Sequence, residues 1–152
     1  MSEHKIRINW QKGTEEFTYE TYDRTHEISF EGGRKILASA TSTYFGKAEY
    51  ANPEELITAA LCSCHLLTFL AVAARKKFTI LQYSDAAVAT LEKNPEGKLS
   101  IVKIDLYPRT KFSSDKVPDM EELRSLHELS HKNCFIGNSI KSQVVIHPEI
   151  AN

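Results

Sequence analysis

Apolar and polar side chains alternate in short segments over the first 50 residues of the chain. Three segments show this pattern: Lys5–Trp10, Phe17–Tyr19 and Ile28–Phe30. Gly32 and Gly33 follow the last of them. Alternation with a period of two predicts β-strands that bury one face, and a pair of glycines predicts a turn. We therefore expect the chain to begin with strands and turns.

A long apolar segment follows, with no Asp, Glu, Lys or Arg between Leu56 and Ala74. The residues before it are typical of a helix start. Asn52 can cap the helix, Pro53 suits its first position, and Glu55 lies at the capping-box position. These signals predict a helix of about 24 residues, about 36 Å long at ~1.5 Å per residue.

This predicted helix is apolar on all sides, which allows two interpretations. A bilayer is crossed by about 20 apolar residues, but Thr58, Ser63, His65 and Thr68 interrupt the segment and strand-like segments flank it. A helix that is apolar all round is otherwise a central core helix. Its apolar surface exceeds what a chain of 152 residues can easily cover. We expect burial against a second copy of the chain and no membrane association.

Further strands and a second helix are predicted after the central helix. Asn94–Gly97 has the composition of a hairpin turn. Glu122 lies three residues after Asp119, as in a capping box. The predicted elements are a hairpin of Ala86–Leu91 and Leu99–Leu106, a helix from about Asp119 to Lys132, and a strand at Gln143–Ile146. This order predicts an α+β fold, with an antiparallel β-sheet packed around the long central helix in one domain over residues 1–152.

The overall composition is that of an ordinary globular protein. The chain has 152 residues, 41% of them apolar, and 19 Lys and Arg against 20 Asp and Glu, for a net charge of −1. The near-neutral balance, with no basic block, argues against a nucleic-acid partner. The first seven residues lack the apolar core of a signal peptide, so we expect a cytoplasmic protein.

The three cysteines are the candidates for chemistry, because cysteines in a reducing compartment are more often catalytic, metal-binding or buried than disulfide-bonded. Cys62 and Cys64 are about 200° apart around a helix, so their side chains cannot coordinate one metal ion together. Periodicity alone does not separate them, and Cys62 is interpreted as a small core residue. Cys134 follows the second predicted helix, where a side chain can be partly exposed.

Two cysteine segments resemble those of the OsmC/Ohr family of thiol peroxidases. They are Asn52–Cys64 and, seventy residues later, Ser130–Cys134. The resemblance implies an OsmC-like fold, with Cys64 as the peroxidatic cysteine that reacts with organic hydroperoxides and Cys134 as the resolving cysteine. Many relatives have proline after the second cysteine, where this chain has Phe135.

The family also has an arginine near its reactive cysteine. Tyr22–His26 resembles the arginine segment of one OsmC-like branch, which implies Arg24 as this residue, with Arg34 as the second choice. Glu54 would orient the arginine. Because Glu54 and Cys64 are ten residues apart, about 15 Å along a helix, we expect Glu54 to act from the second subunit of an intertwined homodimer.

Peroxide reduction requires a thiolate, because the thiolate is the nucleophile. A thiol with a pKa near 8.5 is only about 3% ionised at pH 7. Burial would raise the pKa of Cys64, and Cys64 lies too far from the helix N-terminus to use the dipole. We therefore expect a cation near Cys64, and an arginine from the strand region is the physically sensible source.

The expected cycle passes through a sulfenic acid on Cys64, which Cys134 converts to a disulfide. An external dithiol then restores both thiols; the resemblance suggests a lipoyl-type dithiol. No metal or organic cofactor is expected. Four aromatic residues could line an apolar mouth for the hydroperoxide, although most of them are better explained as core residues: Tyr44, Phe45, Phe69 and Phe135.

Two alternatives involve zinc. His127, Glu128 and His131 match the H-E-x-x-H pattern of zinc hydrolases, and a zinc-binding domain could instead use His131 and Cys134 with Cys64. The simpler interpretation is that His127 and His131 lie on the solvent-facing side of an amphipathic helix. His65 is interpreted as a satisfied core histidine, and no role is assigned to His26 or Trp10.

Overall fold

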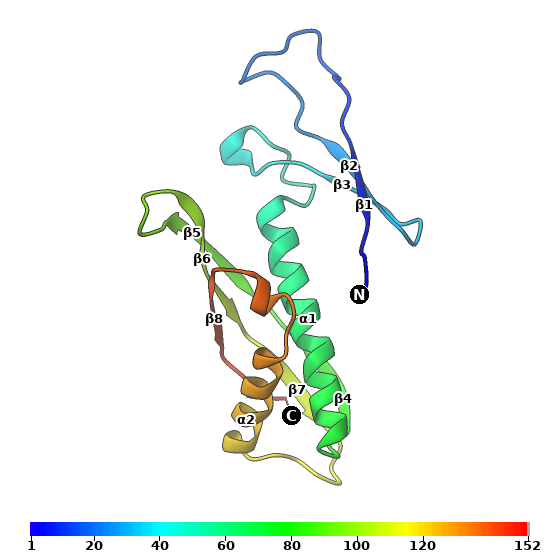
Figure 1. Cartoon of the computed structure of the whole chain (residues 1–152), viewed down its shortest axis with the longest axis vertical. Helices are drawn as coiled ribbons and strands as arrows, with labels where there is room; N and C mark the ends of the chain where they lie inside the picture. The colour runs from blue at the N-terminus through cyan, green and yellow to red at the C-terminus, as the bar shows by residue number, and fades with distance from the viewer. Residues whose placement is uncertain (152) are drawn as a thin grey trace. The chain divides into compact units, whose positions relative to one another are not determined.

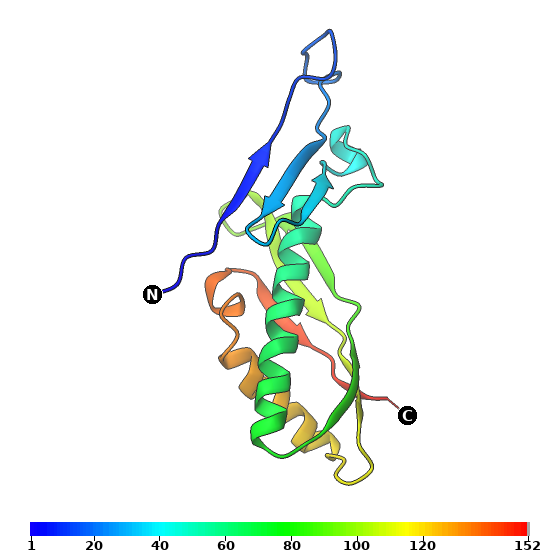
Figure 2. The ribbon, with the colours of Figure 1, turned by 90° about the vertical axis from the view of Figure 1, so that its right-hand side faces the viewer.

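The computed structural model describes residues 1–151 (Figures 1 and 2). They divide into two compact units, Met1–Leu56 and a second that begins at Ile57. The mixture of helices and sheets confirms the α+β fold class. The expectation of one domain stays a prediction.

The N-terminal unit contains a three-stranded antiparallel sheet in the order β1-β2-β3. Its strands are β1 (Ile6–Asn9), β2 (His26–Phe30) and β3 (Lys35–Ala38), followed by a short 3₁₀ helix η1 (Ser42–Tyr44). The strand predicted at residues 17–19 was wrong, because Thr18 forms a turn instead. Its carbonyl accepts from the backbone N–H of Tyr22 at 3.2 Å, and its N–H donates to the Thr21 hydroxyl at 3.1 Å.

Helix α1 (Pro53–Arg75) confirms the predicted central helix and its capping box. The Glu55 N–H donates to the Asn52 side chain at 2.9 Å, and the Asn52 N–H donates to the Glu55 carboxylate at 3.1 Å. At the other end Lys77 adopts a left-handed conformation with φ of 63°. The helix therefore ends where its apolar run ends.

The α1 helix is long and apolar enough to cross a membrane by length and composition, with a mean hydropathy of 2.1 over its most apolar window. In the C-terminal unit one side of it is buried, including Leu61, Phe69 and Ala73. Leu67 and Leu70 on another side are 64% and 36% exposed. The helix is thus a core element on one face and uncovered on the other.

Six strands of the C-terminal unit form two three-stranded sheets, in the orders β4-β7-β9 and β5-β6-β8. The strands are β4 (Ile80–Ser84), β5 (Val88–Lys93), β6 (Leu99–Leu106), β7 (Arg109–Phe112), β8 (Gln143–Ile146) and β9 (Glu149–Ile150). The β5-β6 hairpin and β8 confirm predictions. The pairings of β8 with β6 and of β9 with β7 are parallel, so the sheets are not purely antiparallel as predicted.

Helix α2 (Met120–Lys132) begins with the predicted capping box, in which Asp119 and Glu122 bond each other's backbone N–H. It lies beside α1 in both ribbon views (Figures 1 and 2). Phe69 of α1 packs with Leu123 and Leu126 of α2 in one core cluster. A second 3₁₀ helix, η2 (Gly137–Ser139), follows α2. The chain segment between α2 and η2 is therefore held against α1.

Candidate active site

The structure brings Cys64 and Cys134 together. Cys64 lies on α1 and is half-buried, whereas Cys134 lies in the turn after α2 and is fully buried. Both belong to one cluster with Leu61, Ile104 and Leu106, and each thiol is close enough to shift the pKa of the other. The expected partial exposure of Cys134 was wrong, because this cluster covers the thiol.

Backbone amides of the turn after α2 point at both sulfur atoms. The N–H of Ile136 donates to Cys64 Sγ at 3.5 Å, and the N–H of Gly137 donates to Cys134 Sγ at 3.3 Å. Sequence reasoning missed these donors, because every residue has a backbone N–H and only the fold decides where it points.

The two thiols differ in their pKa. Burial alone would raise the pKa of Cys64, but the adjacent Cys134 thiol and the amides of Ile136 and Phe135 outweigh burial and lower it. Burial and the adjacent Cys64 raise the pKa of Cys134 to about 11. Cys64 is therefore the better nucleophile of the pair. The groups of the C-terminal unit that lower the pKa of Cys64 are uncharged. The cation expected near Cys64 from the sequence stays a prediction.

An apolar groove of about 570 Å³ opens beside Cys64, between α1 and the end of α2. Its other lining residues are Leu67, Thr68, Ala71, Val72, Arg75, Lys76, Leu129, Asn133 and Phe135. The Phe135 side chain is 81% exposed and forms part of its wall. Of the four aromatic residues considered for an apolar mouth, only Phe135 lines this groove; Phe69 is a fully buried core residue.

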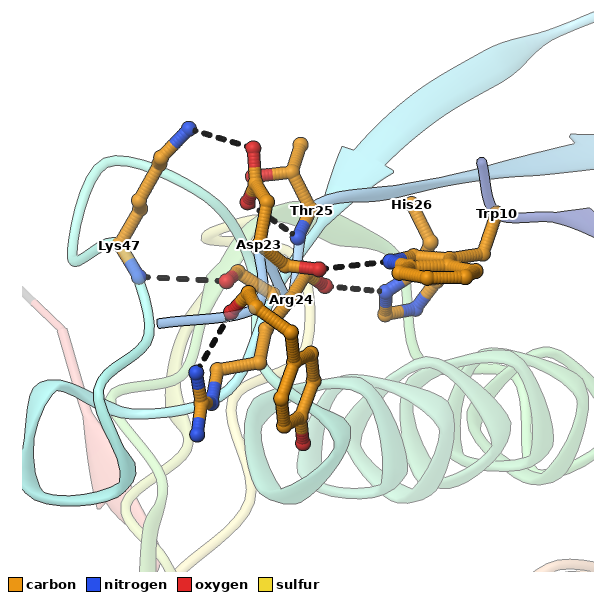
Figure 3. Close-up of polar contacts among 8 residues, drawn as sticks. Trp10, Asp23, Arg24, Thr25, His26 and Lys47 are labelled. Carbon is orange, nitrogen blue, oxygen red and sulfur yellow. Dashed lines mark hydrogen bonds and ion pairs between the residues drawn. The ribbon is translucent and has the colours of Figure 1, made fainter. Parts of the chain in front are cut away.

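Arg24 is held by aromatic rings and carbonyls of the N-terminal unit (Figure 3). It is only 8% exposed. Its guanidinium lies 3.9 Å from the centre of the Tyr22 ring and donates to the carbonyls of Tyr22, at 2.6 Å, and of Tyr19. The neighbouring Asp23 accepts from the Thr25 N–H at 2.8 Å. These contacts fix the segment that carries the arginine.

Arg24 also lines a pocket of about 440 Å³. The other lining residues are Trp10, Phe17, Tyr22, His26, Ser39, Ala40 and Pro53. Trp10 Nε1 donates to the Asp23 carbonyl at 2.6 Å, which ties β1 to the arginine segment (Figure 3). Trp10 and His26, to which no role was assigned from the sequence, thus line the same pocket as Arg24.

A family model described as OsmC-like protein matches residues 46–149. The chain belongs to the OsmC-like protein family. This match covers both cysteines and the two helices that position them. It confirms the resemblance inferred from the two cysteine segments.

Solved structures extend the OsmC-like match to the whole fold. An OsmC-like protein of unknown function from Vibrio cholerae is 41% identical, with a TM-score of 0.92 over 99% of this chain and 100% of that chain. Two organic hydroperoxide resistance proteins share the fold at lower identity. The protein from Elizabethkingia anophelis has 17% identity and a TM-score of 0.71, over 99% of this chain and 98% of that one. OhrB of Bacillus subtilis has 18% identity and a TM-score of 0.68, with the same coverage. No match was found among curated proteins.

The remaining predicted site residues of this OsmC-like protein lie in its N-terminal unit. Glu54 is half-buried in the first turn of α1 and has interaction partners. Arg34, the second choice of arginine, is exposed between β2 and β3. Cys64 belongs to the C-terminal unit. A site that combines Arg24 and Glu54 with Cys64 therefore stays a prediction.

Cys62 has different surroundings from Cys64. Burial, together with the nearby Asp85 carboxylate, raises the pKa of Cys62 to about 11. Its thiol packs against the core cluster around Leu61. A neutral, packed thiol is a poor nucleophile, which agrees with the interpretation of Cys62 as a core residue.

The H-E-x-x-H segment is part of the core contact between the two helices. His127 is 2% exposed and stacks on Phe69 at a centroid distance of 4.2 Å. Its Nδ1 is 2.9 Å from Nε2 of the fully buried His65. The interpretation of His127 as solvent-facing was wrong, because it lies on the buried face of α2. Within residues 1–151, no group of three or more His, Cys, Asp or Glu side chains is arranged to hold a metal ion.

Proposed function

We propose that this protein is a thiol-dependent peroxidase that reduces organic hydroperoxides, with Cys64 as the nucleophile and Cys134 as the resolving thiol. The observation that carries the proposal is that Cys64 and Cys134, 70 residues apart, pack in one cluster beside a turn that donates to both sulfur atoms. The lowered pKa of Cys64 and the raised pKa of Cys134 agree with their two roles. The apolar groove beside Cys64 suits the organic part of a hydroperoxide. Membership of the OsmC-like family supports the same activity.

The first step is attack of the Cys64 thiolate on the distal oxygen of the hydroperoxide. An S–O bond forms, the O–O bond breaks, and the leaving alkoxide takes up a proton to become an alcohol. The sulfur is oxidised to a sulfenic acid and the peroxide is reduced. Phe135 and Thr68, which line the groove, would contact the organic group of the substrate.

In the second step Cys134 attacks the sulfenic sulfur of Cys64. An S–S bond forms, the S–O bond breaks, and the hydroxyl group leaves as water with the proton of Cys134. The raised pKa of Cys134 keeps that proton on the thiol until it is needed. An external dithiol, which we propose to be of the lipoyl type, then reduces the disulfide by two electrons. This chemistry suits a cytoplasmic, reducing compartment.

Arg24 is proposed to stabilise the alkoxide as it leaves, and Glu54 to orient the guanidinium. An arginine near the reactive cysteine is what the family resemblance implies. A guanidinium suits the task because it is always charged and presents several N–H donors. Two N–H groups of the Arg24 guanidinium donate to the carbonyls of Tyr19 and Tyr22. Its remaining N–H groups would donate to the substrate.

A second copy of the chain is proposed to cover the exposed face of α1. That face carries no charged side chain and consists of Ala59, Ala60, Ser63, Leu67, Leu70 and Ala74. An uncharged helix face of this length is costly to leave in water. The resulting homodimer would place a second set of Arg24 and Glu54 side chains within the assembly.

A substitution that introduces a charge on that face tests the homodimer. Leu67→Glu should shift the protein from dimer to monomer, because Leu67 is 64% exposed on α1 and a dimer would bury it. Leu99→Glu is the control, since Leu99 is similarly exposed, at 60%, but lies on β6. Light scattering after size exclusion measures the mass. A wild-type protein that is monomeric at working concentration would contradict the proposal.

Peroxidase activity is tested with serine variants of the three cysteines. Consumption of cumene hydroperoxide with a dithiol donor should be lost in Cys64→Ser and retained in Cys62→Ser. In Cys134→Ser, one equivalent of peroxide should leave a sulfenic acid on Cys64 that dimedone traps and peptide mass spectrometry locates. Unchanged turnover in Cys64→Ser would refute the assignment.

A further inference from the structure

The turn that connects α2 to η2 directs consecutive backbone amides at sulfur. Its ends are closed by ordinary hydrogen bonds: the Cys134 N–H donates to the His131 carbonyl at 3.1 Å, and the Asn138 N–H donates to the Cys134 carbonyl at 2.9 Å. The three amides between these ends, at Phe135, Ile136 and Gly137, have no carbonyl acceptor among residues 1–151. Buried amides are rarely left without an acceptor. Sulfur atoms are the partners of the Ile136 and Gly137 amides.

Each amide of this turn has an identifiable target. Ile136 donates to Cys64 Sγ at 3.5 Å, and Gly137 to Cys134 Sγ at 3.3 Å. The Phe135 amide, next to Ile136 in the turn, also favours the ionised form of Cys64. Two amides thus favour the thiolate of Cys64, and a different one serves Cys134.

Side-chain hydrogen bonds hold this turn on the end of α2. The Asn138 side chain donates to the Lys132 carbonyl at 3.2 Å, and the Ser139 hydroxyl donates to the Phe135 carbonyl at 2.8 Å. These bonds restrict rotation of the amides away from the sulfur atoms. Donors that are fixed before reaction cost no reorganisation when charge develops.

We propose that the backbone N–H of Ile136, with that of the adjacent Phe135, is a positioning donor that holds Cys64 as the thiolate. The inference rests on the proposed function, in which Cys64 is the nucleophile. The geometry that carries it is the hydrogen bond from the Ile136 N–H to Cys64 Sγ, between residues 72 positions apart in the chain. The Phe135 side chain is 81% exposed and is not needed for this role.

A pH titration of the wild-type amide resonances tests the contact directly. The amide protons of Phe135 and Ile136 should shift with one common midpoint, because both donate to the group that ionises. The same shifts should be absent in Cys64→Ser. The Gly137 amide is the internal control, since it donates to Cys134 and should not follow the Cys64 midpoint. Amides of Phe135 and Ile136 that do not titrate, or that titrate equally in Cys64→Ser, would overturn the inference.

Proline variants test the consequence for reactivity. Ile136 has φ of −66°, which matches the fixed φ of proline, so Ile136→Pro removes the donor with little change in backbone angle. Phe135→Pro removes the other donor. Ile136→Ala and Phe135→Ala are the matched controls, because they shorten the side chain and keep the N–H.

The readout is the pH at which Cys64 is half-alkylated, in a Cys62→Ser background and with circular dichroism to check folding. Each proline variant should raise this midpoint by about one unit, which lowers the alkylation rate at pH 7 by up to about tenfold. The alanine controls should match the background protein. Folded proline variants with an unchanged midpoint would overturn the inference. If the wild-type protein does not turn over peroxide but the proline variants show these midpoint shifts, only the proposed function would be refuted.

Discussion

The buried pair His65 and His127 makes the stability of this protein depend on pH. Both rings are enclosed and joined by one hydrogen bond of 2.9 Å. His65 Nδ1 and His127 Nε2 have no partner within residues 1–151. Burial, with His131 nearby, lowers the pKa of His65 to about 4. Burial, with His65 nearby, lowers the pKa of His127 to about 3. The folded protein therefore keeps both rings neutral in mild acid.

The sign and size of the effect follow from proton linkage. In the unfolded chain both histidines take up protons below their ordinary value of 6.5. Between pH 6.5 and about 4 the unfolded chain thus binds more protons, so stability falls as the pH falls. At pH 4.5 each histidine costs about 2.5 kcal/mol, about 5 kcal/mol together. Asp85, whose pKa is raised mainly by burial, acts in the opposite direction. The loss is comparable with the whole stability of many domains.

Urea unfolding at pH 7.0, 5.5 and 4.5, followed by far-UV circular dichroism at one protein concentration, measures this loss. The double variant His65→Leu/His127→Leu is the control, because it removes both titrating groups and replaces them with apolar side chains of similar size. Its free energy of unfolding should depend much less on pH. A wild-type loss below about 1 kcal/mol between pH 7.0 and 4.5, or an equally steep loss in the double variant, would refute the reasoning.

A further prediction concerns the N-terminal unit. Gly46→Ala should lower the free energy of unfolding by at least about 2 kcal/mol, because its Cβ would lie 1.7 Å from the Ala40 carbonyl oxygen. Gly13→Ala, with nothing within 4 Å, should be neutral in the same thermal melt; equal effects would contradict the clash.

Local features of the sequence determined the elements that were predicted well. The starts of both long helices were correct because each capping box forms within four residues, at Asn52 and at Asp119. The β5-β6 hairpin was correct because the turn at 94–97 is also local. The cysteine segments were specific enough to indicate the family before any fold was known. Such signals depend on neighbours a few residues away, which the sequence displays directly.

Only the tertiary structure decided which groups surround the candidate nucleophile. Helical periodicity did not distinguish Cys62 from Cys64. Their pKa values differ because burial, with Asp85 nearby, raises that of Cys62, whereas Cys134 and the turn after it lower that of Cys64. The same periodicity placed His127 in solvent, whereas packing of α2 on α1 buries it against Phe69. Backbone amides have no sequence signature, so the donors to Cys64 appear only once the chain is folded. Burial and hydrogen bonding set the chemistry of a thiol, and both are properties of residues distant in sequence that the fold brings together.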